Sequence, residues 1–107
     1  MQPMVFTETP NFTQSVLELL SDEAYGELQQ ELRQRPSMGA IIQGTGGIRK
    51  TRVALPGRGK RGGARVIYYW RVSESQILML DIYAKNVRAD LTKDQKAALK
   101  KIVEEWS

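Results

Sequence analysis

The chain has 107 residues, of which 41% are hydrophobic, and this is enough for one domain with its own core. It contains neither cysteine nor histidine, which excludes disulfide scaffolds and thiolate metal sites and removes the commonest general base. Any chemistry must therefore come from lysine, arginine, tyrosine or carboxylate side chains, and the sequence implies no metal or cofactor. The N-terminus lacks a signal peptide pattern, and no apolar stretch is long enough to span a membrane. We therefore expect a soluble, cytoplasmic protein with a single domain over residues 1–107.

Acidic and basic residues are segregated along the chain, although the formal net charge is only +4. Residues 1–31 carry six acidic side chains and no basic one, whereas residues 32–73 carry ten basic side chains and no acidic one. Residues 74–107 are balanced, with six of each. This segregation predicts a surface that faces a polyanion and is built from the middle of the chain. The alternative is a basic face that is solvated and has no partner.

A short β-prone segment at residues 4–7 begins the chain, and two helices are expected to follow it. Thr9 is predicted to cap the first helix, which has a proline at its first position and ends near Leu20. Ser21 is predicted to cap the second helix, and Pro36 stops it. The two helices should form a hairpin whose outer faces carry the acidic block.

The centre of the chain is expected to form strands and turns, because it holds eight of the nine glycines. Alternating and β-branched patterns predict strands at residues 48–55, 65–72 and 77–83. A long loop over residues 56–63 would join the first two strands, and a short one over residues 73–76 would join the second pair. The three strands should therefore form an antiparallel meander.

The last segment is predicted to be an amphipathic helix. Thr92 and Gln95 have the spacing of a capping box, and apolar residues then recur at helical spacing from Leu99 to Trp106. The element order is typical of the α+β class. We expect an N-terminal helical hairpin and a C-terminal helix packed on one face of an antiparallel twisted sheet.

Two glycine-rich segments resemble nucleotide-binding motifs, but neither has the required context. The segment from Gly57 to Gly62 matches G-x-G-x-x-G, yet it leaves one predicted strand and enters another, whereas a dinucleotide fingerprint must open a helix. The segment from Gly44 to Gly47 lacks the spacing of a P-loop. We therefore predict no nucleotide site at either segment.

Basic side chains are expected to converge on one side of the sheet. Strand alternation puts Lys50 and Arg52 on one side, and Arg65 on the same side of the neighbouring strand. A side with charge at every second position does not face a core, because an unpaired buried cation is too costly. The alternative is an ordinary solvated sheet face. The same alternation makes Tyr69 the best aromatic candidate for nucleic-acid contact. Three further cations belong to the loop that would overhang this patch and bind RNA: Arg58, Lys60 and Arg61.

Three segments, residues 43–54, 59–69 and 82–86, read QGTGGIRKTRVA, GKRGGARVIYY and IYAKN. With the early helical hairpin, they make nearly the whole chain resemble the toxins of the RelE superfamily, nearest to its HigB branch. Members of that superfamily are small α+β toxins of bacterial type II toxin–antitoxin systems. Most are ribosome-dependent endoribonucleases that cut mRNA in the decoding site. The resemblance therefore implies an mRNA-cleaving activity that inhibits translation, with the ribosome, mRNA and a cognate antitoxin protein as partners.

The resemblance also assigns catalytic positions. The paired strand cations of the family fall on Lys50 and Arg52, its central arginine on Arg65, and its C-terminal lysine on Lys85. RNA carries its own nucleophile in the 2′-hydroxyl, so cleavage needs no metal if the protein aligns that group and stabilises the phosphate charge. We expect Arg65 and Arg52 to stabilise the transition-state phosphate. Lys50 or Lys85 would activate the 2′-hydroxyl or protonate the leaving 5′-oxygen.

The chain also departs from the family pattern, and other functions are compatible with its basic face. Asn86 stands where an arginine is often found, and Thr92 stands near the place of a catalytic tyrosine. A non-catalytic RNA- or ribosome-binding module would use the same face, and so would an interaction protein that binds an acidic chain. We expect an antitoxin to contact the sheet edge or the helical hairpin and to inhibit by bulk.

Overall fold

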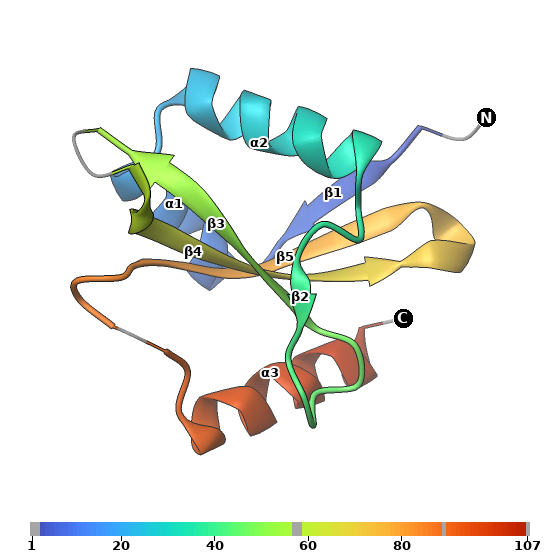
Figure 1. Cartoon of the computed structure of the whole chain (residues 1–107). Helices are drawn as coiled ribbons and strands as arrows, with labels where there is room; N and C mark the ends of the chain where they lie inside the picture. Colours follow the sequence, from blue (N-terminus) through green and yellow to red (C-terminus); the bar gives the residue numbers. More distant parts are fainter. Residues whose placement is uncertain (1–2, 57–58, 89, 107) are drawn as a thin grey trace.

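The computed structural model describes residues 3–56, 59–88 and 90–106, and for residues 59–62 it describes the backbone alone. Within these residues three α-helices accompany one five-stranded, mostly antiparallel sheet in the order β1-β5-β4-β3-β2 (Figure 1). None of the described helices is long and apolar enough to cross a membrane. The elements are β1 (Val5–Glu8), α1 (Pro10–Leu19), α2 (Asp22–Gln34), β2 (Ala40–Ile41), β3 (Arg49–Leu55), β4 (Gly59–Arg71), β5 (Gln76–Ala84) and α3 (Lys93–Glu105), with a 3-10 turn at Val72–Glu74.

The helix starts are confirmed by side-chain caps. The hydroxyl of Thr9 accepts from the backbone N–H three residues on, at 3.1 Å, and Ser21 does the same for α2. Thr92 and Gln95 form the predicted capping box, with reciprocal bonds of 3.1 and 2.8 Å. Each cap satisfies N–H groups that a helix leaves without intrahelical partners. The helices therefore begin where the local sequence predicts.

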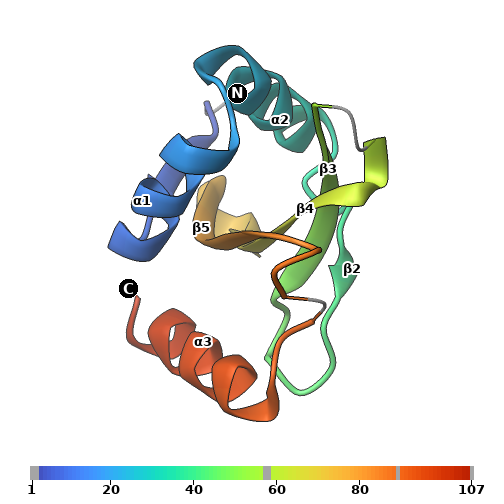
Figure 2. The same cartoon turned by 90° about the vertical axis from the view of Figure 1, so that its left-hand side faces the viewer.

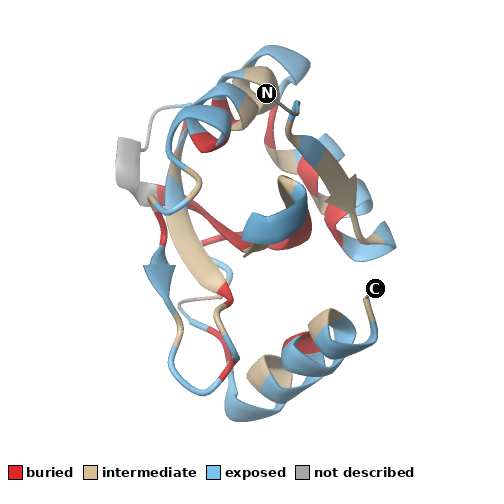
Figure 3. Cartoon of the chain, turned by 90° about the vertical axis from the view of Figure 1, so that its right-hand side faces the viewer, coloured by how far each residue is buried: buried red, intermediate tan, exposed pale blue. Residues whose placement is uncertain are grey.

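The helices cover both faces of the sheet, so the expectation that all three pack on one face is wrong. α1 and α2 lie on one face and α3 on the other (Figures 1 and 2). The reason lies in β4 and β5, which contribute buried residues to both core clusters, one on each face of the sheet. Figure 3 colours each residue by how far it is buried. The first core cluster includes Phe12, Leu28, Leu32, Val66, Tyr68 and Met79, and the second includes Ile48, Ile67, Leu80, Tyr83, Leu91 and Leu99.

Three details of the sheet differ from the prediction. β1 pairs with β5 in parallel, Val5 opposite Gln76, so the sheet is not wholly antiparallel. β4 begins at Gly59, which shortens the loop expected over residues 56–63, because extended backbone is open to glycine as to any residue. β2 was not predicted, since two residues are too few to show a period.

The glycine-rich loop between β2 and β3 is a self-contained turn. The buried Thr45 hydroxyl donates to the Ile42 carbonyl at 2.6 Å and accepts from the Ile48 N–H at 3.2 Å. Gly44 and Gly46 have φ angles of 80° and 78°, a region that side chains other than glycine rarely occupy. The loop thereby returns the chain into β3, which carries two of the predicted site cations.

Candidate functional site

The four cations assigned to catalysis meet in one pocket. Lys50, Arg52, Arg65 and Lys85 line it together with Ala40, and the pocket has a volume of about 280 Å³. We call this the cation pocket. No carboxylate lines it among the described residues, and the four side chains come from β3, β4 and the segment after β5. The structure therefore brings the predicted residues together, while their catalytic role stays a prediction.

Strand register explains why these side chains converge. Arg52 of β3 lies directly opposite Arg65 of β4, and Lys50 lies two residues earlier on the same side of β3. Lys85 follows the last residue of β5, and its N–H donates to the Gly63 carbonyl at 3.0 Å. Three of the four cations therefore stand on strands, which hold side chains more precisely than loops do, and the fourth follows directly after a strand.

Arg65 is deeply buried. The sequence had predicted that it lies on a solvent-exposed, charged side of the sheet, so its burial was not expected. Only 5% of Arg65 is exposed, and its guanidinium donates to the Ala64 carbonyl at 3.3 Å. Ile48, expected on the same side, is completely buried in the cluster against α3. α3 thus covers part of this face and leaves the cation pocket beside it. A buried guanidinium has little freedom to move, which suits a group that must be placed before a charged transition state forms.

Lys50 is paired with a carboxylate at the edge of the pocket. Its Nζ lies 3.5 Å from Asp90 Oδ1, and both side chains are substantially exposed. Asp90 also accepts the backbone N–H of Leu91 at 2.8 Å. That hydrogen bond, together with the Lys50 and Lys96 ammonium groups, lowers the pKa of Asp90. An exposed pair of this kind contributes only about 0–1 kcal/mol, so an incoming phosphate can replace the carboxylate.

Tyr83 lies opposite Arg65 in the neighbouring strand and was not among the predicted site residues, because the sequence favoured a sheet-packing role for it. It is 4% exposed, and its hydroxyl has no hydrogen-bond partner among the described residues. Burial raises the pKa of Tyr83, and Asp90 raises it further. The Arg88 guanidinium lies 4.1 Å from the Tyr83 ring centroid and bonds Asp81 at 2.9 Å. The strand pattern showed an aromatic residue here, but only the register shows that it lies opposite Arg65.

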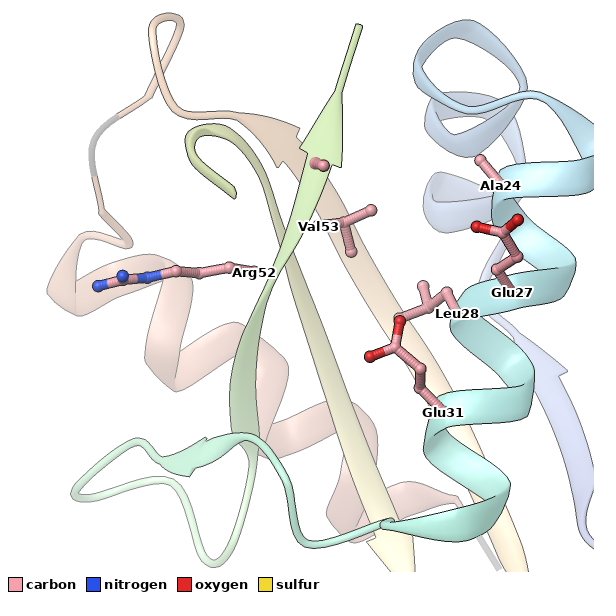
Figure 4. A pocket seen from close by; sticks show the side chains of 7 residues that line it. Ala24, Glu27, Leu28, Glu31, Arg52 and Val53 are labelled. Carbon is pink, nitrogen blue, oxygen red and sulfur yellow. The ribbon is translucent and has the colours of Figure 1, made fainter. Parts of the chain in front are cut away.

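The acidic block lies on the other side of the sheet from the cation pocket. Glu27 and Glu31 of α2 are exposed and line a smaller pocket with Leu28 and with residues 52–54 of β3, Arg52 included. Figure 4 shows Val53 pointing toward α2, whereas the Arg52 side chain points away from it. The sheet therefore separates these acids from the cations, and the segregation of charge along the chain becomes a segregation in space.

The predicted RNA-binding residues have a different outcome. Arg58 lies outside the described residues, and so do the side chains of Lys60 and Arg61. Tyr69 is half-buried, packs against the α3-side core, and does not line the cation pocket. Its ring lies 3.6 Å from the position of a Cβ built on Gly47. RNA contact by these four residues stays a prediction.

The described residues contain no group of three carboxylates that would hold a metal ion. The cation pocket offers lysine and arginine side chains, which are well suited to hydrogen-bond phosphate oxygens. The candidate site thus combines a five-stranded sheet with four convergent cations.

The chain matches the family model described as RelE toxin of the RelE / RelB toxin–antitoxin system over residues 23–107, and it belongs to this family. Two solved structures are similar in fold. The isolated Escherichia coli RelE toxin has a TM-score of 0.57 and 13% identity, with 94% of this chain and 99% of that chain covered. A double arginine-to-alanine variant of E. coli RelE in the free state also has a TM-score of 0.57, with 12% identity and coverage of 82% and 90%. At these identities the likeness shows the fold.

Proposed function

We propose that this chain is the toxin of a type II toxin–antitoxin system, of the HigB branch, and that it cleaves mRNA on the ribosome in the cytoplasm. The family membership supports the toxin assignment. The observation that carries the enzymatic proposal is the meeting of Lys50, Arg52, Arg65 and Lys85 in one pocket. These groups supply what a metal-free attack of RNA on its own phosphodiester requires.

The proposed reaction begins with the 2′-hydroxyl of the RNA. Its oxygen attacks the adjacent phosphorus and loses its proton, and the bond from phosphorus to the 5′-oxygen breaks. The products are a 2′,3′-cyclic phosphate and a 5′-hydroxyl, which gains a proton. Arg65, held by burial, and Arg52, which is exposed in the pocket, stabilise the negative charge on the phosphate oxygens. Lys50 or Lys85 carries a proton to or from the reacting oxygens.

The test is to map new mRNA 5′ ends on translating ribosomes with the wild type and matched arginine variants. Arg52 is exposed in the cation pocket, whereas Arg35 is exposed and lies outside it. Arg52→Ala should reduce cleavage by roughly 10²-fold, the usual effect of removing one charge-stabilising donor, and leave stability unchanged. Arg35→Ala should cleave like the wild type.

Arg65 needs a variant that keeps its buried charge, because alanine would leave a cavity and an altered fold. Arg65→Lys retains the charge and loses the bidentate fork, so it should lose cleavage while circular dichroism stays that of the wild type. Ribosome binding by the wild type without new 5′ ends would identify a non-catalytic ribosome-binding module instead. Full cleavage by Arg52→Ala and Arg65→Lys would refute the role of the pocket.

The family implies a RelB-type antitoxin as partner. We propose that it binds at the edge of β3 beside α2 and inhibits by bulk. β2 pairs only with Arg49 and Lys50 of β3. Among the described residues, no strand therefore pairs with residues 51–55 on that edge of β3. The adjoining pocket combines apolar Leu28 with acidic Glu27 and Glu31, which suits a strand with basic side chains.

A competition experiment tests this binding mode. A short RNA bound at the cation pocket should stay bound when purified antitoxin is added, because the side chain of Arg52, the one described residue that lines both pockets, points away from α2 (Figure 4). Displacement of the RNA, with Lys50 and Arg52 protected from chemical modification in the complex, would show direct occlusion of the pocket instead.

A further inference from the structure

A second basic pocket is lined by the loop after β2 and by α3. Figures 1 and 2 show this loop beside α3. The pocket has a volume of about 500 Å³ and shares no lining residue with the cation pocket. Three lysines on one side of α3, spaced three and four residues apart, form its wall. We call it the lysine pocket; its lining residues are Gln43, Gly44, Lys93, Lys96, Ala97 and Lys100.

The charges of this pocket are not balanced within the described residues. None of Lys93, Lys96 and Lys100 takes part in an ion pair there, and no acidic residue is among the described residues that line the pocket. Lys93 and Lys96 also lie at the first and fourth positions of α3, where the helix macrodipole disfavours cations. This placement does nothing for the helix itself, so it points to an anionic ligand from outside.

The carboxylate of Asp90 interacts with a lysine of each basic pocket. The carboxylate of Asp90 pairs with Lys50 of the cation pocket at 3.5 Å. The Lys96 ammonium of the lysine pocket also helps to lower the pKa of the same carboxylate. A polyanion long enough to pass Asp90 can therefore contact both pockets at once.

We propose that the lysine pocket binds the phosphate backbone of double-helical RNA. Single-stranded RNA is usually held by aromatic side chains that stack on its bases, and none of the described lining residues is aromatic. Double-helical RNA is instead recognised by its shape and its phosphates. The choice of RNA rests on the proposed function, because the cation pocket is the one assigned to mRNA.

The geometry of the lysine pocket suits a rigid row of phosphates. From Lys93 to Lys100 the helix rises by about 10 Å, and the intervening Lys96 lies on the same side. Across the pocket, Gly44 has open space where a Cβ would stand, so a nucleic-acid backbone can approach the loop closely. The three lysines thus offer positive charges at fixed intervals along α3, and the loop opposite them leaves room for the RNA backbone.

The first test compares two neighbouring lysines of α3. Lys100 lines the pocket, whereas Lys101 is exposed on the same helix and does not. Binding of a blunt-ended RNA duplex is measured by fluorescence anisotropy over a series of salt concentrations. Lys100→Gln should weaken binding several-fold and reduce the salt slope by about one, as expected for one lost phosphate contact. Lys101→Gln should change neither. Equal effects of the two variants, or no effect of Lys100→Gln, would overturn the proposal.

A second test uses Lys93→Gln/Lys96→Gln/Lys100→Gln to separate the two pockets and the two kinds of ligand. This variant should lose most duplex binding and retain binding of a short unpaired RNA, which depends on Arg52. The same assay is run with an acidic peptide that carries as many charges as the duplex. Tighter binding of the peptide than of the duplex, lost in Lys100→Gln, would indicate a protein partner instead of RNA and overturn the proposal. Ribosome pelleting with Lys100→Gln then distinguishes ribosomal RNA from structured mRNA as the source of the duplex.

The two proposals fail independently, because duplex binding is measured without cleavage. Lys100-dependent duplex binding without new mRNA 5′ ends would refute only the proposed enzymatic function. New 5′ ends together with duplex binding that ignores Lys100 would refute only the lysine pocket proposal.

Discussion

Replacing Gly39 by alanine should destabilise the protein, because there is no room for a side chain where β2 begins. A Cβ on Gly39 would lie 2.9 Å from the Lys50 carbonyl oxygen and 2.9 Å from two atoms of the Tyr68 ring and hydroxyl. The Gly39 N–H also donates to the Tyr68 hydroxyl at 2.9 Å, and that hydroxyl donates to the Pro36 carbonyl at 2.7 Å. Two of these three atoms belong to the completely buried side chain of Tyr68 and the third belongs to the backbone of Lys50, so none of them can move away easily.

The expected magnitude follows from overpacking. Forcing an extra methyl group into a well-packed region costs about 1–3 kcal/mol. Gly26 is the matched control, since it lies within α2 and a Cβ there meets nothing within 4 Å. Gly26→Ala should therefore stabilise the protein by about 0.5–1 kcal/mol, the helix preference for alanine. The same chemical change thus has opposite signs at two positions.

Urea unfolding followed by tryptophan fluorescence measures both effects. The two variants should differ by about 1.5–4 kcal/mol, or roughly 10 °C in melting temperature, with unchanged m-values. Under conditions in which Gly39→Ala is still folded, it should also cleave less than the wild type. The added methyl group would displace β2, and β2 carries Ala40 of the cation pocket. A Gly39→Ala variant within about 0.5 kcal/mol of the wild type would show that β2 does not pack on Tyr68 and would refute this reasoning.

Three further predictions concern titration and charge. Burial raises the pKa of Tyr25, Tyr68 and Tyr83, with the Glu8 carboxylate adding to the rise at Tyr25, so the folded state holds these protons more tightly than the unfolded chain does. These groups should therefore leave the free energy of unfolding unchanged below about pH 10 and lower it as the pH rises further. Tyr25→Phe should make the urea midpoint fall less steeply with pH in that alkaline range. Asp90→Asn should release Lys50 and tighten binding of a short RNA severalfold, with little change in stability. The control Asp94→Asn, in the first turn of α3, should leave RNA affinity the same. Equal RNA affinities of the two variants would contradict the idea that the Asp90 carboxylate competes with RNA for Lys50. Replacing Arg58, Lys60 and Arg61 by serine should weaken ribosome association and reduce its salt slope by about three at most, and an unchanged slope would show that these residues point elsewhere.

Local features of the fold could be predicted from the sequence because the interactions that set them span only a few residues. Thr9, Ser21 and Thr92 cap their helices through hydrogen bonds to N–H groups three residues away. Period-two alternation likewise placed Lys50 and Arg52 on one side of β3, before any partner strand was known. The family resemblance added Lys85, which no local pattern connects to the other three cations of the pocket.

Tertiary structure alone decided how these elements combine. An amphipathic helix shows that it has an apolar side but not which sheet face will receive it, and α3 packs opposite α1 and α2. The parallel pairing of β1 with β5 likewise joins residues about seventy positions apart in the chain, as Val5 and Gln76 show. Such contacts depend on which surfaces remain to be buried once the local elements have formed.

The candidate site has the same two origins. The residue types and their sides came from the sequence, whereas the depth of Arg65, the neighbouring Tyr83 and the pairing of Lys50 with Asp90 came from the packing. Lys50 and Asp90 are forty residues apart and meet because α3 is drawn against Ile67 and Leu80 by the burial of apolar surface. Long-range burial therefore decides which charges become neighbours, and no short-range pattern in the sequence records it.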